Sequence, residues 1–171
     1  MYYNHVVFIF IVSFTLFRVG VMSDILFWSL DTFGKDSSLH TESRLSRIHF
    51  HSLTYHIIAV VKNYWLHGSA AAAAGSSAAT RQACDQEDIR VDEVELRTPK
   101  DFARSVNFRP LRRNLIKHDE GNPVSFWSRE KIEFYFSAVL VCKRPKRTVG
   151  LGDCISATGL QYSTFNTSGH V

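Results

Sequence analysis

The stretch of the sequence with the clearest chemical potential is a glycine turn that carries an acid, residues 149–153 (VGLGD). It follows an apolar run, residues 138–142, and a basic loop, residues 143–148, and it precedes a helix-like segment, residues 154–160. Glycines let a backbone approach a phosphate closely, and the unpaired amides at a helix N-terminus attract an anion. Asp153 is placed to accept a proton from a hydroxyl nucleophile. The turn therefore predicts phosphoryl transfer, with an anion hole beside a general base.

This G-x-G-D pattern is weak evidence by itself, because aspartate is a common helix cap and glycine a common turn residue. It is not the G-x-G-x-x-G dinucleotide fingerprint, and no G-K-[ST] follows that would make it a Walker motif. The strand expected before it and the helix expected after it favour a functional site. A plain capped turn is the alternative.

The longer string that contains the turn, residues 139–160, resembles the C-terminal signature of the eukaryotic ADP-dependent glucokinases, which are sugar kinases of the ribokinase-like superfamily. The resemblance runs from near Val19 to about Thr164 and leaves residues 1–18 outside it. Three further blocks carry it in family order: residues 21–28 (VMSDILFW), residues 47–57 (RIHFHSLTYHI) and Gln82-Ala83-Cys84. The resemblance implies an α/β fold, of which residues 19–171 form a part. That part is the C-terminal portion of the large nucleotide-binding domain of a ribokinase-like three-layer sandwich, without the lid.

The reaction that the resemblance implies is transfer of the β-phosphoryl group of ADP to the 6-hydroxyl of D-glucose, which gives AMP and glucose 6-phosphate with Mg²⁺. The family's general base carries over to Asp153, which we also expect to contact the metal. The backbone of the turn carries over as the anion hole at three positions, Gly150, Leu151 and Gly152. The basic loop borders the nucleotide, with Arg147 as the candidate phosphate contact and Thr148 beside it.

Two departures from the family bear on activity. Its magnesium motifs are N-x-x-E and H-x-E; the first is absent here, and His40-Thr41-Glu42 fits the second only as letters, in a polar linker where the family does not place it. The lid and most of the sugar-binding residues are also missing. We therefore expect this chain to be inactive as a glucokinase by itself. The alternatives are a non-catalytic fragment or interaction protein, and an incomplete gene model or splice product.

The elements that must position the turn follow from hydrophobic spacing. A helix is expected over residues 22–33, with Ser23 or Asp24 as its N-cap and Gly34 as its stop. Residues 63–84 are alanine-rich and predict a helix interrupted at Gly75, or a low-complexity insertion. Strands are expected over residues 47–53, 55–61, part of 85–95, and 130–142, whose end (AVLVC) is typical of a strand buried on both faces. Residues 99–123, with Arg109, Arg112 and Arg113, predict a loop-rich excursion.

Composition excludes several classes of protein. The 171 residues carry a formal charge of +4 with 45% hydrophobic residues, which rules out a disordered or collagenous chain and a multi-span membrane protein. Interleaved charges give no argument for nucleic-acid binding, and we expect a monomer. Residues 6–17 are apolar but short for a bilayer span, so a targeting leader and a buried strand both remain open. Localisation is therefore open between the secretory pathway and the cytoplasm, and the Asn166-Thr167-Ser168 sequon matters only for the former.

Cysteines, histidines and tryptophans are expected to be structural. Cys84, Cys142 and Cys154 are too few for a disulfide framework and form no C-x-x-C pair, so each is interpreted as a small buried residue. Alternation on a strand brings histidines to one face, yet no acid or cysteine completes a metal set at suitable spacing. We expect buried or edge histidines that support the nucleotide pocket, and core tryptophans; these are His49, His51, His56, Trp28, Trp65 and Trp127.

Overall fold

The computed structural model describes residues 6–10, 19–35, 45–98, 101–107, 114–119 and 121–166. They form a five-stranded sheet in the order β1-β2-β3-β9-β8. β1 pairs with β2 in parallel, whereas all the other neighbours are antiparallel. The strands are β1 (Val6–Phe10), β2 (Arg47–His51), β3 (Tyr55–Val61), β8 (Val124–Arg129) and β9 (Ile132–Ala138).

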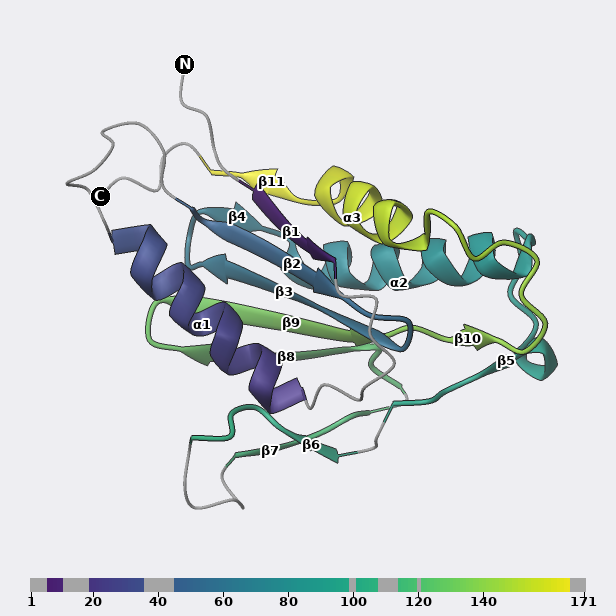
Figure 1. Ribbon diagram of the computed structural model, residues 1–171, viewed down its shortest axis with the longest axis horizontal. Helices are drawn as coiled ribbons and strands as arrows, with labels where there is room; N and C mark the ends of the chain where they lie inside the picture. The colour runs from purple at the N-terminus through teal and green to yellow at the C-terminus, as the bar shows by residue number, and fades with distance from the viewer. Residues whose placement is uncertain are drawn as a thin grey trace.

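Helices cover both faces of this sheet (Figure 1). The helix α1 (Val19–Lys35) packs its Leu26 and Leu30 on one face, against Ile48 and Phe134. On the other face lie α2 (Gly68–Cys84) and α3 (Leu151–Gln161), where Ala71 and Ala72 of α2 contact Ile58 and Val60. The expected α/β fold with three layers is therefore confirmed for the described part of the chain.

The helix α1 confirms the predicted helix, but its start differs from the prediction. It begins at Val19, so Ser23 and Asp24 lie inside it and neither is an N-cap. The buried Asp24 carboxylate instead accepts hydrogen bonds from Ser105 Oγ (2.7 Å), Arg129 Nη1 (2.8 Å) and the Val106 amide (2.9 Å). Asp24 thus ties α1 to β8 and to the segment after residues 101–103. Tertiary hydrogen bonds explain this buried acid better than capping does.

The alanine-rich helix α2 runs unbroken from Gly68 to Cys84, so the predicted interruption at Gly75 was wrong. Gly75 is there for close packing, because a Cβ atom at this position would lie 3.1 Å from the Ile155 carbonyl oxygen of α3. A Cβ atom on Gly68 would meet the Tyr135 ring of β9 at 2.3 Å. Small residues therefore bring α2 close to both the sheet and α3.

The apolar run 138–142 is not a continuous strand buried on both faces, and that prediction was wrong. β9 ends at Ala138, and Leu140 is 37% exposed while its carbonyl oxygen accepts a hydrogen bond from Thr80 Oγ1 (2.9 Å). The chain then forms a short strand, β10 (Val141–Cys142), which pairs with β5 (Val94–Glu95) in a separate antiparallel sheet. A hydrogen bond from the Val139 amide to the Thr54 carbonyl oxygen marks where it leaves the main sheet.

The smaller elements refine the remaining predictions. Residues 99–123 include a strand pair, β6 (Asp101–Ala103) with β7 (Leu115–Lys117), whereas Arg109, Arg112 and Arg113 lie outside the described residues. No strand was predicted over the residues that form β8. The turn η1 (Val91–Glu93) precedes β5, and β4 (Trp65–Leu66) pairs with β11 (Thr164–Phe165).

Two expectations on apolar residues have mixed outcomes. Trp65 and Trp127 are buried as expected, but Trp28 is 56% exposed on α1 and does not belong to the core. Residues 6–10 of the apolar leader form β1, and residues 11–18 lie outside the described part. No helix among the described residues is both long and apolar enough to cross a membrane.

Candidate active site

The glycine turn forms the N-terminus of α3, as the sequence predicted. Gly150 is the N-cap residue with φ of 77° and ψ of 7°, a left-handed conformation that favours glycine. Its carbonyl oxygen accepts the first helical hydrogen bond, from the Cys154 amide (2.9 Å). Because the N-cap has no side chain, the helix N-terminus has no side-chain cap. The amides of the first turn of α3 are therefore available to an anion.

Asp153 lies in this first turn of α3 with its side chain exposed. The same position sets the carboxylate within one helical turn of the open amides. Asp153 and the amides can thus act on one bound substrate, the first as base and the second as anion ligands.

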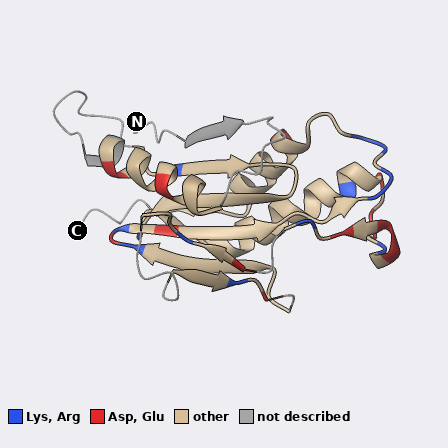
Figure 2. Ribbon diagram, turned by 60° about the horizontal axis from the view of Figure 1, so that its bottom comes forward, with Lys and Arg blue, Asp and Glu red and all other residues tan. Residues whose placement is uncertain are grey.

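The basic loop before the turn is fixed to the C-terminus of α2. The Lys146 amide donates to the Ala83 carbonyl oxygen (2.8 Å), and Gln82 Nε2 donates to the Val149 carbonyl oxygen (3.1 Å). Arg147 pairs with Asp85 at 3.0 Å, and both side chains are largely exposed. The acidic and basic residues of this loop and of η1 gather at one end of the molecule (Figure 2). The backbone of the loop is therefore held in place while its cations face solvent.

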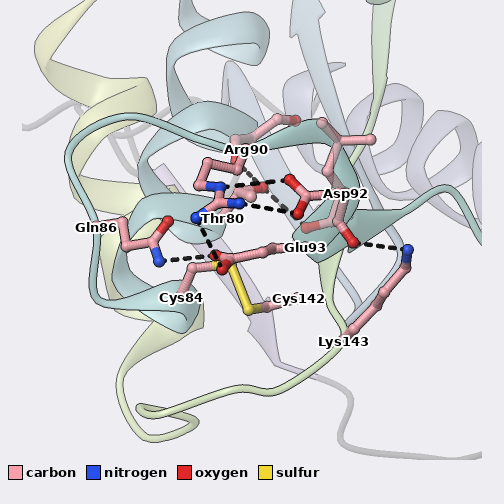
Figure 3. Close-up of a disulfide and its surroundings, with 10 residues drawn as sticks. Thr80, Cys84, Gln86, Arg90, Asp92, Glu93, Cys142 and Lys143 are labelled. Atoms are coloured by element: carbon pink, nitrogen blue, oxygen red, sulfur yellow. Dashed lines mark hydrogen bonds and ion pairs between the residues drawn. A yellow bond between two sulfur atoms is a disulfide. The ribbon is translucent and has the colours of Figure 1, made fainter.

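A disulfide joins the same two segments (Figure 3). Cys84 at the end of α2 is bonded to Cys142 in β10, with 5.6 Å between their Cα atoms. Both cysteines are buried, as predicted, but the interpretation of each as a separate small residue missed the bond between them. Cys154 is a free thiol and is only half-buried. The two partners are 58 residues apart, so their spacing gave no local signal. Each residue of the block Gln82-Ala83-Cys84 therefore holds the loop or the strand that leads into it.

A cavity of about 530 Å³ lies beside this disulfide. Its lining combines apolar sulfur and proline atoms with charged side chains from the basic loop and from η1. The residues are Cys84, Gln86, Glu93, Cys142, Arg144, Pro145 and Lys146. Three of these residues, Arg144, Pro145 and Lys146, belong to the basic loop that leads into the turn.

The face of β2 that α3 covers carries a row of basic side chains, Arg47, His49 and His51, all buried. His49 Nε2 and His56 Nδ1 are 2.8 Å apart, and His56 Nε2 lies 3.0 Å from the Ala72 carbonyl oxygen. A carbonyl oxygen only accepts, so His56 carries its proton on Nε2 and His49 donates to His56 Nδ1. His56 Nε2 also lies 2.8 Å from Ser76 Oγ, which donates to Ser137 Oγ (2.7 Å).

Burial keeps these histidines neutral. It lowers the pKa of His56 to about 3, although the bond to the Ala72 carbonyl opposes this shift. Burial, followed by the proximity of His56 and of the charged Arg47, holds the pKa of His49 well below its ordinary value. The two rings also leave no room for a side chain at Gly159 of α3 and at Gly75 of α2. A Cβ atom on Gly159 would lie 3.0 Å from His49 Cε1, and one on Gly75 would lie 3.4 Å from His56 Cε1. The prediction of core histidines is confirmed.

His51 connects this row to the turn. Burial lowers the pKa of His51, whereas the negative charge of Asp153 raises it. The carboxylate of the candidate base is therefore close enough to His51 for their charges to interact. The sequence did not predict that His51 and Asp153 lie close together, because their proximity depends on how α3 packs over β2.

The described residues do not make a metal site on their own. No cluster of three or more histidine, cysteine, aspartate or glutamate side chains that could hold a metal occurs among them. Asp153 is a single exposed carboxylate, and a magnesium ion bound by protein usually takes one or two carboxylates together with substrate phosphates. His40-Thr41-Glu42 lies outside the described residues.

Comparisons with known proteins give a consistent set of matches. The family model described as "ADP-specific Phosphofructokinase/Glucokinase conserved region" matches residues 8–162. The chain is 50% identical over 145 residues to "ADP-dependent glucokinase" of Bos taurus, covering 85% of this chain and 28% of that protein. It is 40% identical over 154 residues to "Probable ADP-dependent glucokinase" of Caenorhabditis elegans, covering 86% and 30%. The chain thus spans less than a third of the length of these relatives.

Two solved structures are similar over part of the chain. One is "Last common ancestor of ADP-dependent phosphofructokinases from Methanosarcinales", with a TM-score of 0.45, 20% identity, and coverage of 69% of this chain and 26% of that one. The other is "ADP-dependent kinase complex with fructose-6-phosphate and ADPbetaS", with a TM-score of 0.43, 20% identity, and coverage of 69% and 28%.

Proposed function

Since the chain belongs to the ADP-specific phosphofructokinase/glucokinase family, we propose that it carries the base-bearing part of an ADP-dependent glucokinase site. The observation that carries this proposal is the exposed Asp153 in the first turn of α3, behind a left-handed Gly150 that leaves the helix N-terminus uncapped. Position and chemistry of these residues match what phosphoryl transfer needs from a protein.

In the proposed reaction, the Asp153 carboxylate accepts the proton of the 6-hydroxyl of D-glucose. The hydroxyl oxygen forms a bond to the β-phosphorus of ADP as the bond to the bridging oxygen breaks, and AMP leaves with that oxygen. The amides of Gly150, Leu151 and Gly152 bind the phosphoryl oxygens, where charge accumulates. The reaction requires a base and an anion hole near the phosphorus. In this proposal the turn provides both of them.

The nucleotide is proposed to lie along the basic loop. Arg147 is the proposed phosphate contact and Thr148 lies next to it. The pairing of Arg147 with Asp85 at the exposed surface keeps the cation near the turn, and an exposed pair of this kind is weak enough to exchange partners. The cavity beside the disulfide supports a place for the planar base of the nucleotide.

Mg²⁺ is proposed to arrive with the nucleotide, held by its phosphates and water and contacted by Asp153. It would supply neutralisation of phosphate charge. The described residues offer one carboxylate to it, and the proton transfer and anion binding proposed above use only Asp153 and the backbone of the turn. A single metal ligand among the described residues supports the proposal that this chain alone does not catalyse the reaction. A non-catalytic interaction role is the second candidate, favoured by the same observation.

Two measurements on this chain test the proposal. Titration of ADP into the ¹⁵N-labelled chain should shift the amide signals of residues 150–153, and Gly150→Ala should weaken this binding because its left-handed φ strains alanine. Shifts confined to other regions, or none, would contradict nucleotide binding at the turn. A coupled assay for glucose 6-phosphate with ADP and Mg²⁺ should detect no product. Robust turnover that Asp153→Ala abolishes would overturn the proposed incompleteness.

A further inference from the structure

Arg47, the first residue of β2, is the largest fully buried side chain of the described chain, with 0% of its surface exposed. Two contacts fix its guanidinium group. Nη1 donates to Ser163 Oγ after the C-terminus of α3, and the group lies over the Trp65 ring at 5.1 Å from the ring centroid. Ser163 Oγ in turn donates to the Gly159 carbonyl oxygen (2.7 Å). The cation is therefore oriented by the packed core.

The two remaining nitrogen atoms of this group, Nε and Nη2, are buried and have no hydrogen-bond acceptor. They carry the two parallel N–H bonds on one edge of the guanidinium plane. This is the edge on which a carboxylate binds with both of its oxygens. One edge is thus held by Ser163, while the nitrogen atoms of the bidentate edge are buried without an acceptor.

A neutral guanidinium group does not explain this edge. Burial lowers the pKa of Arg47 to about 10, which still leaves the group charged at neutral pH. A buried charge without a counter-ion is strongly unfavourable, whereas a hydrogen-bonded pair offsets much of that cost. Two carboxylates of the described residues pair with other arginines: Asp24 with Arg129 and Asp85 with Arg147.

We propose that Arg47 is a binding site for a single carboxylate group, held by Nε and Nη2 in a bidentate pair and oriented by Trp65 and Ser163. The carboxylate comes either from a free small anion or from an acidic side chain of another polypeptide segment. Both sources share the same chemistry, and neither depends on the proposed kinase reaction, because Arg47 lies at the opposite end of α3 from Asp153.

The test uses the Arg Nε–H signals of the ¹⁵N-labelled chain, because a buried Nε–H reports directly on its acceptor. Sodium formate is titrated at constant ionic strength against sodium chloride, with neutral formamide as the isosteric control. The expected result is a saturable shift of one signal, assigned to Arg47 by its loss in Arg47→Lys. The matched control Arg90→Lys removes an exposed arginine and should leave that shift in place. No shift beyond chloride, or an equal shift of every arginine, overturns the proposal.

Two further arms extend the test. Formate should raise the Tm of the wild-type chain but not the Tm of Arg47→Met. An equal rise in both proteins overturns the proposed site. If Arg47→Met does not fold, the NMR titration decides. The peptides Ac-Thr-Val-Glu-Val-Thr-NH₂ and Ac-Thr-Val-Gln-Val-Thr-NH₂ distinguish the sources. Competition with formate by the glutamate peptide alone supports a polypeptide source, and binding of formate alone supports a free anion. Equal competition by both peptides overturns the requirement for a carboxylate.

Discussion

The buried pair His49 and His56 predicts that the folded chain loses stability on acidification. In the folded state His56 Nδ1 accepts the hydrogen bond donated by His49 Nε2, so His56 cannot take a second proton without losing this bond. The folded pKa of His56 is about 3, and an exposed histidine in the unfolded chain has a pKa near 6.5. Between these values the unfolded state binds more protons than the folded state. Stability is therefore fully present above about pH 6.5 and falls as the pH drops below it.

The size of the effect follows from the pKa difference. Each histidine that must stay neutral costs about 1.4 kcal/mol per pH unit once the pH is below the unfolded pKa. Between pH 6.5 and pH 5, His56 alone should lower the free energy of unfolding by roughly 2 kcal/mol, and His49 adds a loss of the same sign. This is a large fraction of the stability of an ordinary domain.

Denaturant unfolding at half-unit steps from pH 7.5 to pH 5 measures this slope. His56→Gln should reduce the slope by about one proton, although its stability at pH 7.5 also falls because buried hydrogen bonds change. The matched control His67→Asn removes an exposed histidine in a left-handed conformation and should leave the slope unchanged. A free energy of unfolding that is flat from pH 7 to pH 5 would refute the neutral, buried pair.

Three further predictions address the supports of the site. Asp24→Asn should destabilise the chain by about 3 kcal/mol, because it leaves Arg129 without its buried counter-ion; an unchanged denaturation midpoint would contradict this. Gly150→Ala should cost about 1–2 kcal/mol through its positive φ, and a loss below 0.5 kcal/mol in the same assay would argue against the left-handed turn. Cys84→Ser should lower stability by about 2–4 kcal/mol under oxidising conditions. Dithiothreitol should remove this difference, and a difference that persists in reductant would speak against the disulfide.

The sequence predicted those parts of the fold that local patterns determine. The strand over residues 55–61 is rich in isoleucine and valine, and the glycine turn and the helix α3 follow each other directly, so neighbours in sequence are neighbours in space. The helix predicted over residues 22–33 lies wholly inside α1, but the predicted stop was wrong, because α1 continues through Gly34 to Lys35.

Long-range contacts decided the features that the sequence analysis missed. Ser23 and Asp24 suit a helix cap, yet α1 starts earlier and Asp24 is used by Arg129 and Ser105. Gly75 suits a helix break, yet the approach of α3 requires a residue without a side chain. The disulfide joins residues far apart in the chain, and the burial of Arg47 depends on Trp65 and Ser163. None of these partners can be identified from spacing alone.

The most direct test of the central claim uses a chimera of the bovine ADP-dependent glucokinase in which the matching 145-residue segment is replaced by that of this chain. If Asp153 is the base, the chimera should form glucose 6-phosphate from ADP and glucose. Asp153→Asn should then lower kcat by about 10²–10⁴-fold, with little change in nucleotide binding. The matched variant Asp88→Asn changes an exposed aspartate on the surface and should retain full activity. An active chimera whose kcat is unaffected by Asp153→Asn would contradict the assignment of the base.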